Sequence, residues 1–137
     1  MSEREIQVTF PGGLKVDAAY KGFVIKTDQP VHQGGEGTAP APFDLFLASI
    51  ATCAGFYTVA FLRERGIPTE EAGVILHAEK DPETKMISKI RIELHLPAGF
   101  PEKYTRAVIR AVDYCTVKAH IIKAPAFEIS AEIKKQL

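Results

Sequence analysis

Two cysteines are the residues of this sequence whose chemistry is most distinctive. Cys53 and Cys115 are the only cysteines in the 137-residue chain, and they lie far apart in it. A deprotonated cysteine is both a nucleophile and a metal ligand. Neither residue belongs to a short Cys-x-x-Cys or Cys-x-x-His spacing, which argues against a zinc site. Two interpretations stay open for each cysteine: a redox-active thiol, or a buried side chain that acts as a small hydrophobe.

The net charge and the N-terminal residues indicate the compartment and the class of partner that we expect for this protein. The first five residues include three charged ones and lead directly into an alternating segment, without the apolar stretch of a signal peptide. We therefore expect a cytoplasmic protein, where structural disulfides are rare. Basic and acidic residues balance at 17 each, so the formal net charge is zero. This balance argues against a nucleic-acid partner, which usually requires a basic surplus.

Cys53 lies in the most apolar segment of the chain. Residues 45–62 carry no charge, Pro42 and Asp44 suit the start of a helix, and Gly66 suits its end. The run reaches the lower length limit for a membrane span. It is diluted by small and polar residues, namely Ser49, Thr52, Gly55 and Thr58. We predict a buried central helix, not a membrane segment, and one too apolar for a single small chain to cover. A second subunit is the natural cover, so we expect an obligate homodimer.

A second helix is predicted to carry Cys115. Apolar residues follow helical spacing after Pro101 and place Cys115 on the buried side, at or near the helix end; they are Tyr104, Val108, Ala111 and Cys115. Residues 116–122 are expected to add another helical turn or two. Both cysteines are thus predicted on apolar helix faces.

Strands are predicted around these helices. Three short strands at 5–10, 14–20 and 23–26 form a meander, followed by a Gly- and Pro-rich loop over 28–42. Residues 74–79 and 86–96 alternate as an antiparallel hairpin with one wet face. A last strand is predicted over 126–134 from the alternation of Phe127, Ile129, Ala131 and Ile133. The order βββ-α-ββ-α-β predicts an α+β protein, with residues 1–137 as one domain.

The segments around both cysteines resemble the OsmC/Ohr family. The run from Gly37-Thr38-Ala39-Pro40 through a small-residue helix to Ala51-Thr52-Cys53 is similar to the family's Gly-Thr-Asn-Pro-Glu-x-Leu motif and its cysteine helix. The second similarity is Phe100-Pro101-Glu102-Lys103-Tyr104, which leads through a helix to Cys115. Because the order of strands also agrees, the resemblance covers essentially the whole chain.

This resemblance implies a fold and a chemistry. The fold is an intertwined homodimer whose two central helices are enclosed by antiparallel sheet, with active sites between the subunits. The Cys53 thiolate would attack an organic hydroperoxide and become a sulfenic acid. Cys115 would condense with it to a disulfide, which a dithiol reductant would reduce. Neither a cofactor nor a metal is implied.

Two residues that activate the cysteine in this family are absent from their expected places. The family's glutamate, ten residues before the cysteine, is Phe43 here; Asp44, one position on, is either a displaced substitute or simply a helix N-terminal charge. The only arginine before Cys53 is Arg4. Lysines could supply a point charge instead, the candidates being Lys15, Lys21 and Lys26.

Without a paired guanidinium, we expect burial to raise the pKa of Cys53 and to weaken any peroxidase activity. Two function classes therefore remain. One is a thiol-dependent peroxidase that acts on organic hydroperoxides. The other is a non-peroxidatic relative that binds an apolar small molecule or exchanges disulfides with a partner. A cation within reach of the Cys53 sulfur would favour the first class.

Overall fold

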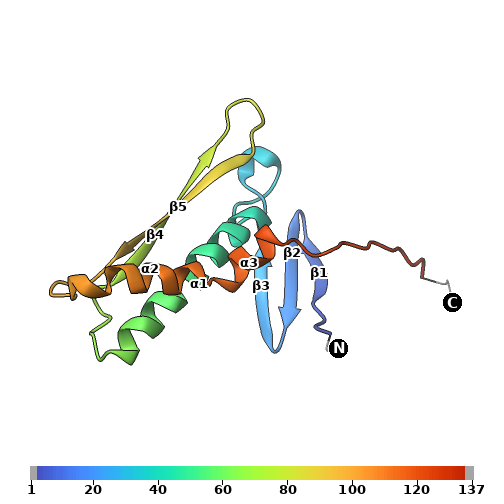
Figure 1. The fold of residues 1–137 in the computed structure, drawn as a ribbon. Coiled ribbons are helices and arrows are strands. Elements are labelled where there is room, and N and C mark those ends of the chain that lie inside the picture. Colours follow the sequence, from blue (N-terminus) through green and yellow to red (C-terminus); the bar gives the residue numbers. More distant parts are fainter. Residues whose placement is uncertain (1–2, 135–137) are drawn as a thin grey trace. The chain divides into compact units, whose positions relative to one another are not determined.

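A computed structural model of the chain describes residues 3–134 and shows an α+β fold (Figure 1). The chain divides into two compact units, residues 1–49 and 50–137. Helix α1 (Pro42–Glu64) begins in the first unit and continues through the second. The expectation of one domain over 1–137 stays a prediction.

The first unit is built on a three-stranded antiparallel meander. Strands β1 (Gln7–Gly12), β2 (Lys15–Tyr20) and β3 (Phe23–Thr27) pair in the order β1-β2-β3, as the sequence predicts. The register aligns Val8, Ala18 and Ile25 across the sheet, with Tyr20 beside Phe23. Side chains on one face are therefore mainly apolar, yet Phe23 is 70% exposed and Val8 is 49% exposed. The three strands therefore present an apolar face with exposed aromatic and aliphatic side chains.

A loop organised by a buried carboxylate follows the meander. Asp28 is 1% exposed, and its side chain accepts hydrogen bonds from Gln29 N at 2.8 Å, Glu36 N at 3.3 Å, Thr38 N at 3.1 Å and Thr38 Oγ1 at 2.7 Å. The short 3₁₀ helix η1 (Val31–Gln33) lies within this loop. Gly35 packs so tightly that a Cβ there would lie 2.0 Å from the Gln29 carbonyl oxygen. The Gly-rich segment is thus an ordered loop around one anchor.

The second unit packs helices against a hairpin. Strands β4 (Gly73–Lys80) and β5 (Ile87–His95) are antiparallel, and helices α2 (Thr105–Asp113) and α3 (Thr116–Ile122) follow the 3₁₀ turn η2 (Glu102–Tyr104). Leu76 pairs with Ile92 on the apolar face of the hairpin, whereas His77 pairs with Arg91 on the polar face. The buried apolar core of this unit consists of Ile50, Ala54, Phe61, Leu62, Val108, Val112 and Cys115.

Helix α1 ends where the sequence predicts. Gly66 adopts a φ of 65°, which favours glycine, and the Ile67 amide donates back to the Leu62 carbonyl at 3.0 Å. By length and composition α1 could also cross a bilayer, with a mean hydropathy of 1.9 over its most apolar window. The core helix of a globular protein passes the same test, so this property does not decide between the two.

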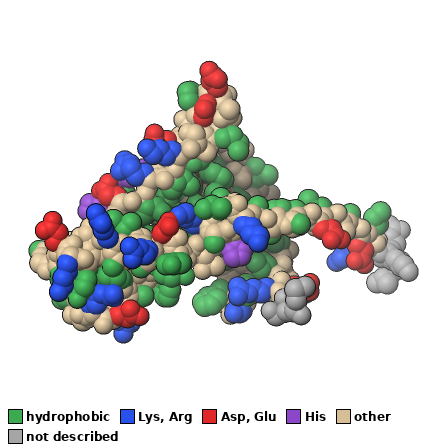
Figure 2. All heavy atoms as spheres, viewed as in Figure 1, with side chains coloured by type: hydrophobic (Ala, Val, Ile, Leu, Met, Phe, Trp, Pro, Cys, Tyr) green, Lys and Arg blue, Asp and Glu red, His purple; other side chains and the backbone are tan. Residues whose placement is uncertain are grey.

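The predicted last strand is wrong for the chain as described. Residues 126–134 form neither helix nor strand, and Phe127, Ile129 and Ile133 are 85%, 93% and 92% exposed. The alternation of apolar residues is present, but a strand forms only when a neighbouring strand accepts its backbone hydrogen bonds. No such neighbour pairs with this segment within the part of the chain that the structure describes. Figure 2 shows hydrophobic and charged side chains exposed along it.

Candidate functional site

The two cysteines lie side by side in the second unit. Cys53 is on α1, while Cys115 occupies the break between α2 and α3, where it is the N-cap residue of α3. The Cys115 sulfur accepts a hydrogen bond from the Lys118 amide at 3.4 Å, and the side chain is 2% exposed. Both cysteines are free thiols, and a side-chain hydrogen bond joins them. The sequence prediction that Cys115 is buried near a helix end is confirmed.

Hydrogen bonds divide the two thiols into an acceptor and a donor. Burial raises the pKa of Cys53, but hydrogen bonds from the Cys115 thiol and from the amides of Val117 and Thr116 outweigh it, so its pKa lies below the ordinary value. Burial and the hydrogen bond with Cys53 raise the pKa of Cys115. Cys53 is therefore the thiol that ionises first. Cys115 keeps its proton and donates it in the hydrogen bond to Cys53.

This polarity corrects the expectation from the sequence. We expected the pKa of Cys53 to rise, because no arginine or glutamate occupies its family position. The groups that lower it are backbone amides and a neighbouring thiol, and none of them is a charged side chain. The sequence offers one weak signal for this arrangement: Thr116 and Val117 begin a helix directly after Cys115, where amides lack helical partners.

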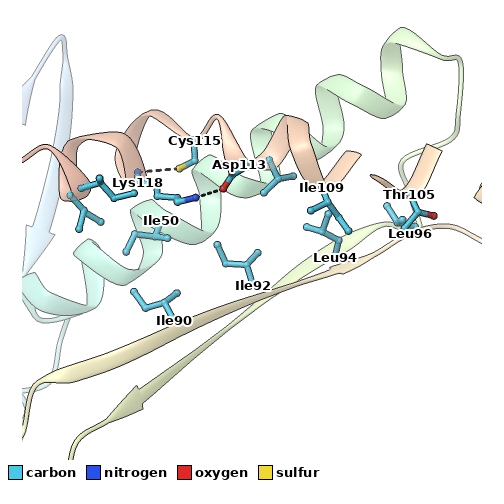
Figure 3. A pocket seen from close by; sticks show the side chains of 13 residues that line it. Ile50, Ile90, Ile92, Leu94, Leu96, Thr105, Ile109, Asp113, Cys115 and Lys118 are labelled. Carbon is cyan, nitrogen blue, oxygen red and sulfur yellow. Dashed lines mark hydrogen bonds and ion pairs between the residues drawn. The ribbon is translucent and has the colours of Figure 1, made fainter. Parts of the chain in front are cut away.

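An apolar pocket adjoins Cys115. Its volume is about 570 Å³, and most side chains around it come from β5, α2 and α3, with Ile50 from α1. Figure 3 shows Ile90, Ile92 and Leu94 of β5 facing the helices across this space. Its polar members include Lys118 and Asp113, which form an ion pair beside Cys115. The pocket can thus hold an apolar group next to Cys115, whereas Cys53 is not among the residues that line it.

Asp44, Lys15 and Lys21, which were also proposed from the sequence, have structural partners. The Asp44 carboxylate accepts a hydrogen bond from the Ala41 amide at 3.0 Å, which caps the start of α1. A catalytic role for Asp44 stays a prediction. In the first unit, Lys15 is paired with Glu36, and Lys21 lies 5.3 Å from the centre of the Tyr20 ring. Within residues 50–134, the pKa of Cys53 is raised by burial and lowered by hydrogen bonds from Cys115, Val117 and Thr116.

One further side-chain contact joins the two cysteine segments. The Tyr57 hydroxyl lies 3.3 Å from Thr116 Oγ1. Tyr57 is one helical turn after Cys53, so both are on the same side of α1, and Thr116 directly follows Cys115. Sequence reasoning treated Tyr57 only as a core or dimer contact. As for metals, no group of three or more His, Cys, Asp or Glu side chains in residues 3–134 could hold an ion.

Known structures share this fold. A protein of Psychrobacter arcticus 273-4, for which an osmotic-stress and detoxification role has been proposed, aligns over 87% of this chain and 88% of its own with a TM-score of 0.72 and 21% identity. A hypothetical protein of Aquifex aeolicus VF5 aligns over 98% of both chains, with a TM-score of 0.67 and 21% identity. At these identities the likeness shows the fold alone.

A Legionella pneumophila protein adds a described activity to the comparison. It is called an organic hydroperoxide resistance protein OsmC, a predicted redox protein and regulator of sulfide bond formation, and it aligns over 88% of this chain and 90% of its own, with a TM-score of 0.59 and 17% identity. No curated protein sequence matches the chain significantly. The family model for OsmC-like proteins matches residues 35–130, well over half of the chain. The chain therefore belongs to the OsmC-like protein family.

Proposed function

We propose that this protein is a thiol-dependent reductase of organic hydroperoxides, with Cys53 as the peroxidatic cysteine and Cys115 as the resolving cysteine. The contact between the two thiols carries the proposal. Cys53 accepts hydrogen bonds that favour its thiolate, while Cys115 stays protonated beside it. The Legionella relative, with its hydroperoxide resistance and redox description, agrees with this chemistry.

The reaction has three balanced steps. The Cys53 thiolate attacks the terminal oxygen of the hydroperoxide; a sulfur–oxygen bond forms, the oxygen–oxygen bond breaks, and the alkoxide takes a proton from water to leave as an alcohol. Cys115 then attacks the Cys53 sulfenic acid, which forms the disulfide and releases water. A dithiol donates two electrons and two protons to regenerate both thiols, and it leaves as its own disulfide.

The surroundings of Cys115, the partner of Cys53, suit an apolar hydroperoxide. The pocket beside Cys115 is lined by branched aliphatic side chains, including Ile50, Ile92 and Ile109. A pocket of about 570 Å³ is in the range for small-molecule sites. Burying an aryl or alkyl group there is favourable at roughly 25 cal/mol per Å². Hydrogen peroxide, which has no apolar part, would gain nothing from this contact.

Single-turnover oxidation tests the two roles. Reduced protein is treated with one equivalent of cumene hydroperoxide, without reductant, and both thiols are followed by mass spectrometry. Wild type should consume one equivalent and lose both thiols to a disulfide. Cys115→Ser should consume one equivalent and hold a sulfenic acid that dimedone traps at Cys53. Cys53→Ser should consume none, whereas Ala51→Ser, which adds a hydroxyl on the same helix, should match wild type. Consumption by Cys53→Ser equal to wild type would contradict the proposal.

A non-peroxidatic function is the second candidate, and the apolar pocket favours it. A protein that only binds an apolar small molecule needs this pocket but no thiolate. Disulfide exchange with a partner needs the thiols but no pocket. Cumene hydroperoxide left unconsumed by the wild type, together with saturable binding of cumyl alcohol, would support the binding function.

We also propose that the working form is a homodimer with active sites at the subunit interface. Two features support it: the exposed apolar side chains of β1–β3, and the segment 126–134, which forms no strand within the described residues. An extended segment with apolar side chains on one side is suited to pair with the edge of another chain's sheet. Sedimentation should give a dimer for wild type at micromolar concentration. Ile129→Asp should weaken the dimer, and Glu128→Gln, on the opposite side of the segment, should not. A stable wild-type monomer would contradict the proposal.

A further inference from the structure

A hydroxyl pair connects the same two segments as the cysteine pair. Tyr57 lies one turn beyond Cys53 on α1, and Thr116 is the residue after Cys115. Their oxygens are 3.3 Å apart, which corresponds to a long hydrogen bond. Tyr57 is half-buried, whereas Thr116 is exposed. Two side-chain contacts, sulfur to sulfur and oxygen to oxygen, therefore join α1 to the start of α3.

We propose that Tyr57 is a positioning residue: its hydroxyl holds Thr116, and through Thr116 it keeps Cys115 and the first amides of α3 against the Cys53 sulfur. This inference rests on the redox role proposed for the two cysteines. Cys115 lies in a break between helices, so its position depends on the contacts of the residues on either side. On the α2 side is Tyr114, which is 73% exposed. On the α3 side is Thr116, which Tyr57 holds.

The contact has two consequences for the chemistry. A thiol held close to its partner reacts at a higher effective concentration. The contact between Tyr57 and Thr116, called the clamp below, therefore favours the disulfide over the dithiol. Thr116 also contributes one of the amides that lower the pKa of Cys53. Loss of the Tyr57 hydroxyl should therefore raise that pKa and make disulfide formation less favourable. A residue that merely stabilised the fold would change neither property in the folded protein.

The test measures the disulfide equilibrium, which requires no peroxide. Folded protein is equilibrated in mixtures of reduced and oxidised dithiothreitol, and the fraction of disulfide is read from alkylation and mass. Tyr57→Phe and Thr116→Val should each lower the equilibrium constant for the disulfide roughly 3- to 10-fold, the range for one net hydrogen bond. The double variant should be no worse than either single variant, because both remove the same contact.

Two control variants separate positioning from general damage. Thr116→Ser keeps a hydroxyl and should retain most of the wild-type equilibrium constant. Tyr114→Phe removes the exposed hydroxyl on the other side of Cys115 and should leave it unchanged. If Tyr57→Phe does not fold, Thr116→Val carries the test, since Thr116 is exposed. The alkylation rate of Cys53 against pH, measured on the same variants, should show a raised pKa in Tyr57→Phe and in Thr116→Val, and an unchanged pKa in Thr116→Ser and Tyr114→Phe.

The outcomes are separable from those of the proposed function. If the wild type forms the disulfide and neither Tyr57→Phe nor Thr116→Val changes the equilibrium constant, the clamp proposal is overturned. The proposed peroxidase function would not be affected by that result. Additive losses in the double variant would also overturn it, because the two hydroxyls would then act independently. A wild type that forms no disulfide would overturn both proposals, since there would be no resolving step to position.

Discussion

Two hydrogen-bond acceptors in this molecule, the buried Asp28 and the half-buried Cys53, are held by backbone amides, but they differ in reactivity. The Asp28 carboxylate accepts four hydrogen bonds from its own loop, which lower its pKa to about 2 from an ordinary value of 3.8; the largest contribution is the Thr38 hydroxyl. The Cys53 sulfur accepts from two amides and from one thiol, and burial opposes all three. The hydrogen bonds of Asp28 hold its loop in place, whereas those of Cys53 favour its thiolate.

The difference shows how similar contacts give different properties. A carboxylate is already ionised at neutral pH, so extra hydrogen bonds fix its loop and add no reactivity. A thiol ionises near neutrality only when something favours the thiolate. At Cys53 one of the donors, Cys115, is itself the reaction partner, so the group that activates the nucleophile also resolves its product. Asp28 has no such partner among its contacts.

Removal of the nucleophile should give the largest effect. Cys53→Ser is expected to lower kcat/KM for cumene hydroperoxide at least about 1,000-fold, because a hydroxyl is almost never ionised at neutral pH. Asp28→Asn should keep most of the activity of the protein that remains folded. Steady-state turnover with a dithiol, normalised to folded protein, compares the two. Equal losses would show that the loop and the cysteines are not functionally distinct.

Replacement of the anchor should change stability instead. Asp28→Asn cannot accept hydrogen bonds through two charged oxygens, and we expect its thermal midpoint to fall by about 5 °C. Because folding lowers the pKa of Asp28, its stabilisation is present above pH 3.8 and is lost as pH falls towards about 2. Wild type should therefore lose stability between those values, and Asp28→Asn should lack that part of the loss.

Thermal melts from pH 5 to pH 2 measure this effect. Glu71→Gln is the matched control, since it removes an exposed carboxylate from the same chain. It should leave both the midpoint and its acid dependence close to those of wild type. An Asp28→Asn variant with the wild-type acid dependence would show that the hydrogen bonds of this carboxylate do not stabilise the fold.

A truncation in the pocket should give the smallest effect. Ile92→Ala is expected to lower kcat/KM for cumene hydroperoxide about tenfold and to leave hydrogen peroxide nearly unaffected, because only the first has an apolar group to bury. Ile75→Ala is the matched control: it makes the same truncation on the other face of the hairpin, where Ile75 is 46% exposed. Equal losses for both peroxides would show that the pocket does not select the substrate.

Much of the fold follows from local pattern, and the failures have a physical cause. Alternation and helical spacing predicted the meander, the hairpin and the helices that hold both cysteines. The strand over 126–134 was predicted from the same alternation, but strand formation depends on an edge to pair with, which no local pattern reveals. The polarity of the cysteine pair was missed because the donors are the amides of Thr116 and Val117, and an amide is the same in every residue type but proline.

The pH dependence of Cys53 alkylation tests the central claim most directly. Cys115→Ala removes the thiol donor and leaves one cysteine, so wild type and this variant are treated with iodoacetamide across pH, and modification of Cys53 is followed by mass. A free cysteine peptide is measured beside them. We predict that the wild-type midpoint lies below that of the peptide, since the hydrogen bonds lower the pKa of Cys53. Cys115→Ala should move the midpoint upward. A wild-type midpoint at or above that of the peptide would contradict the account, because Cys53 would then be a half-buried thiol without activation.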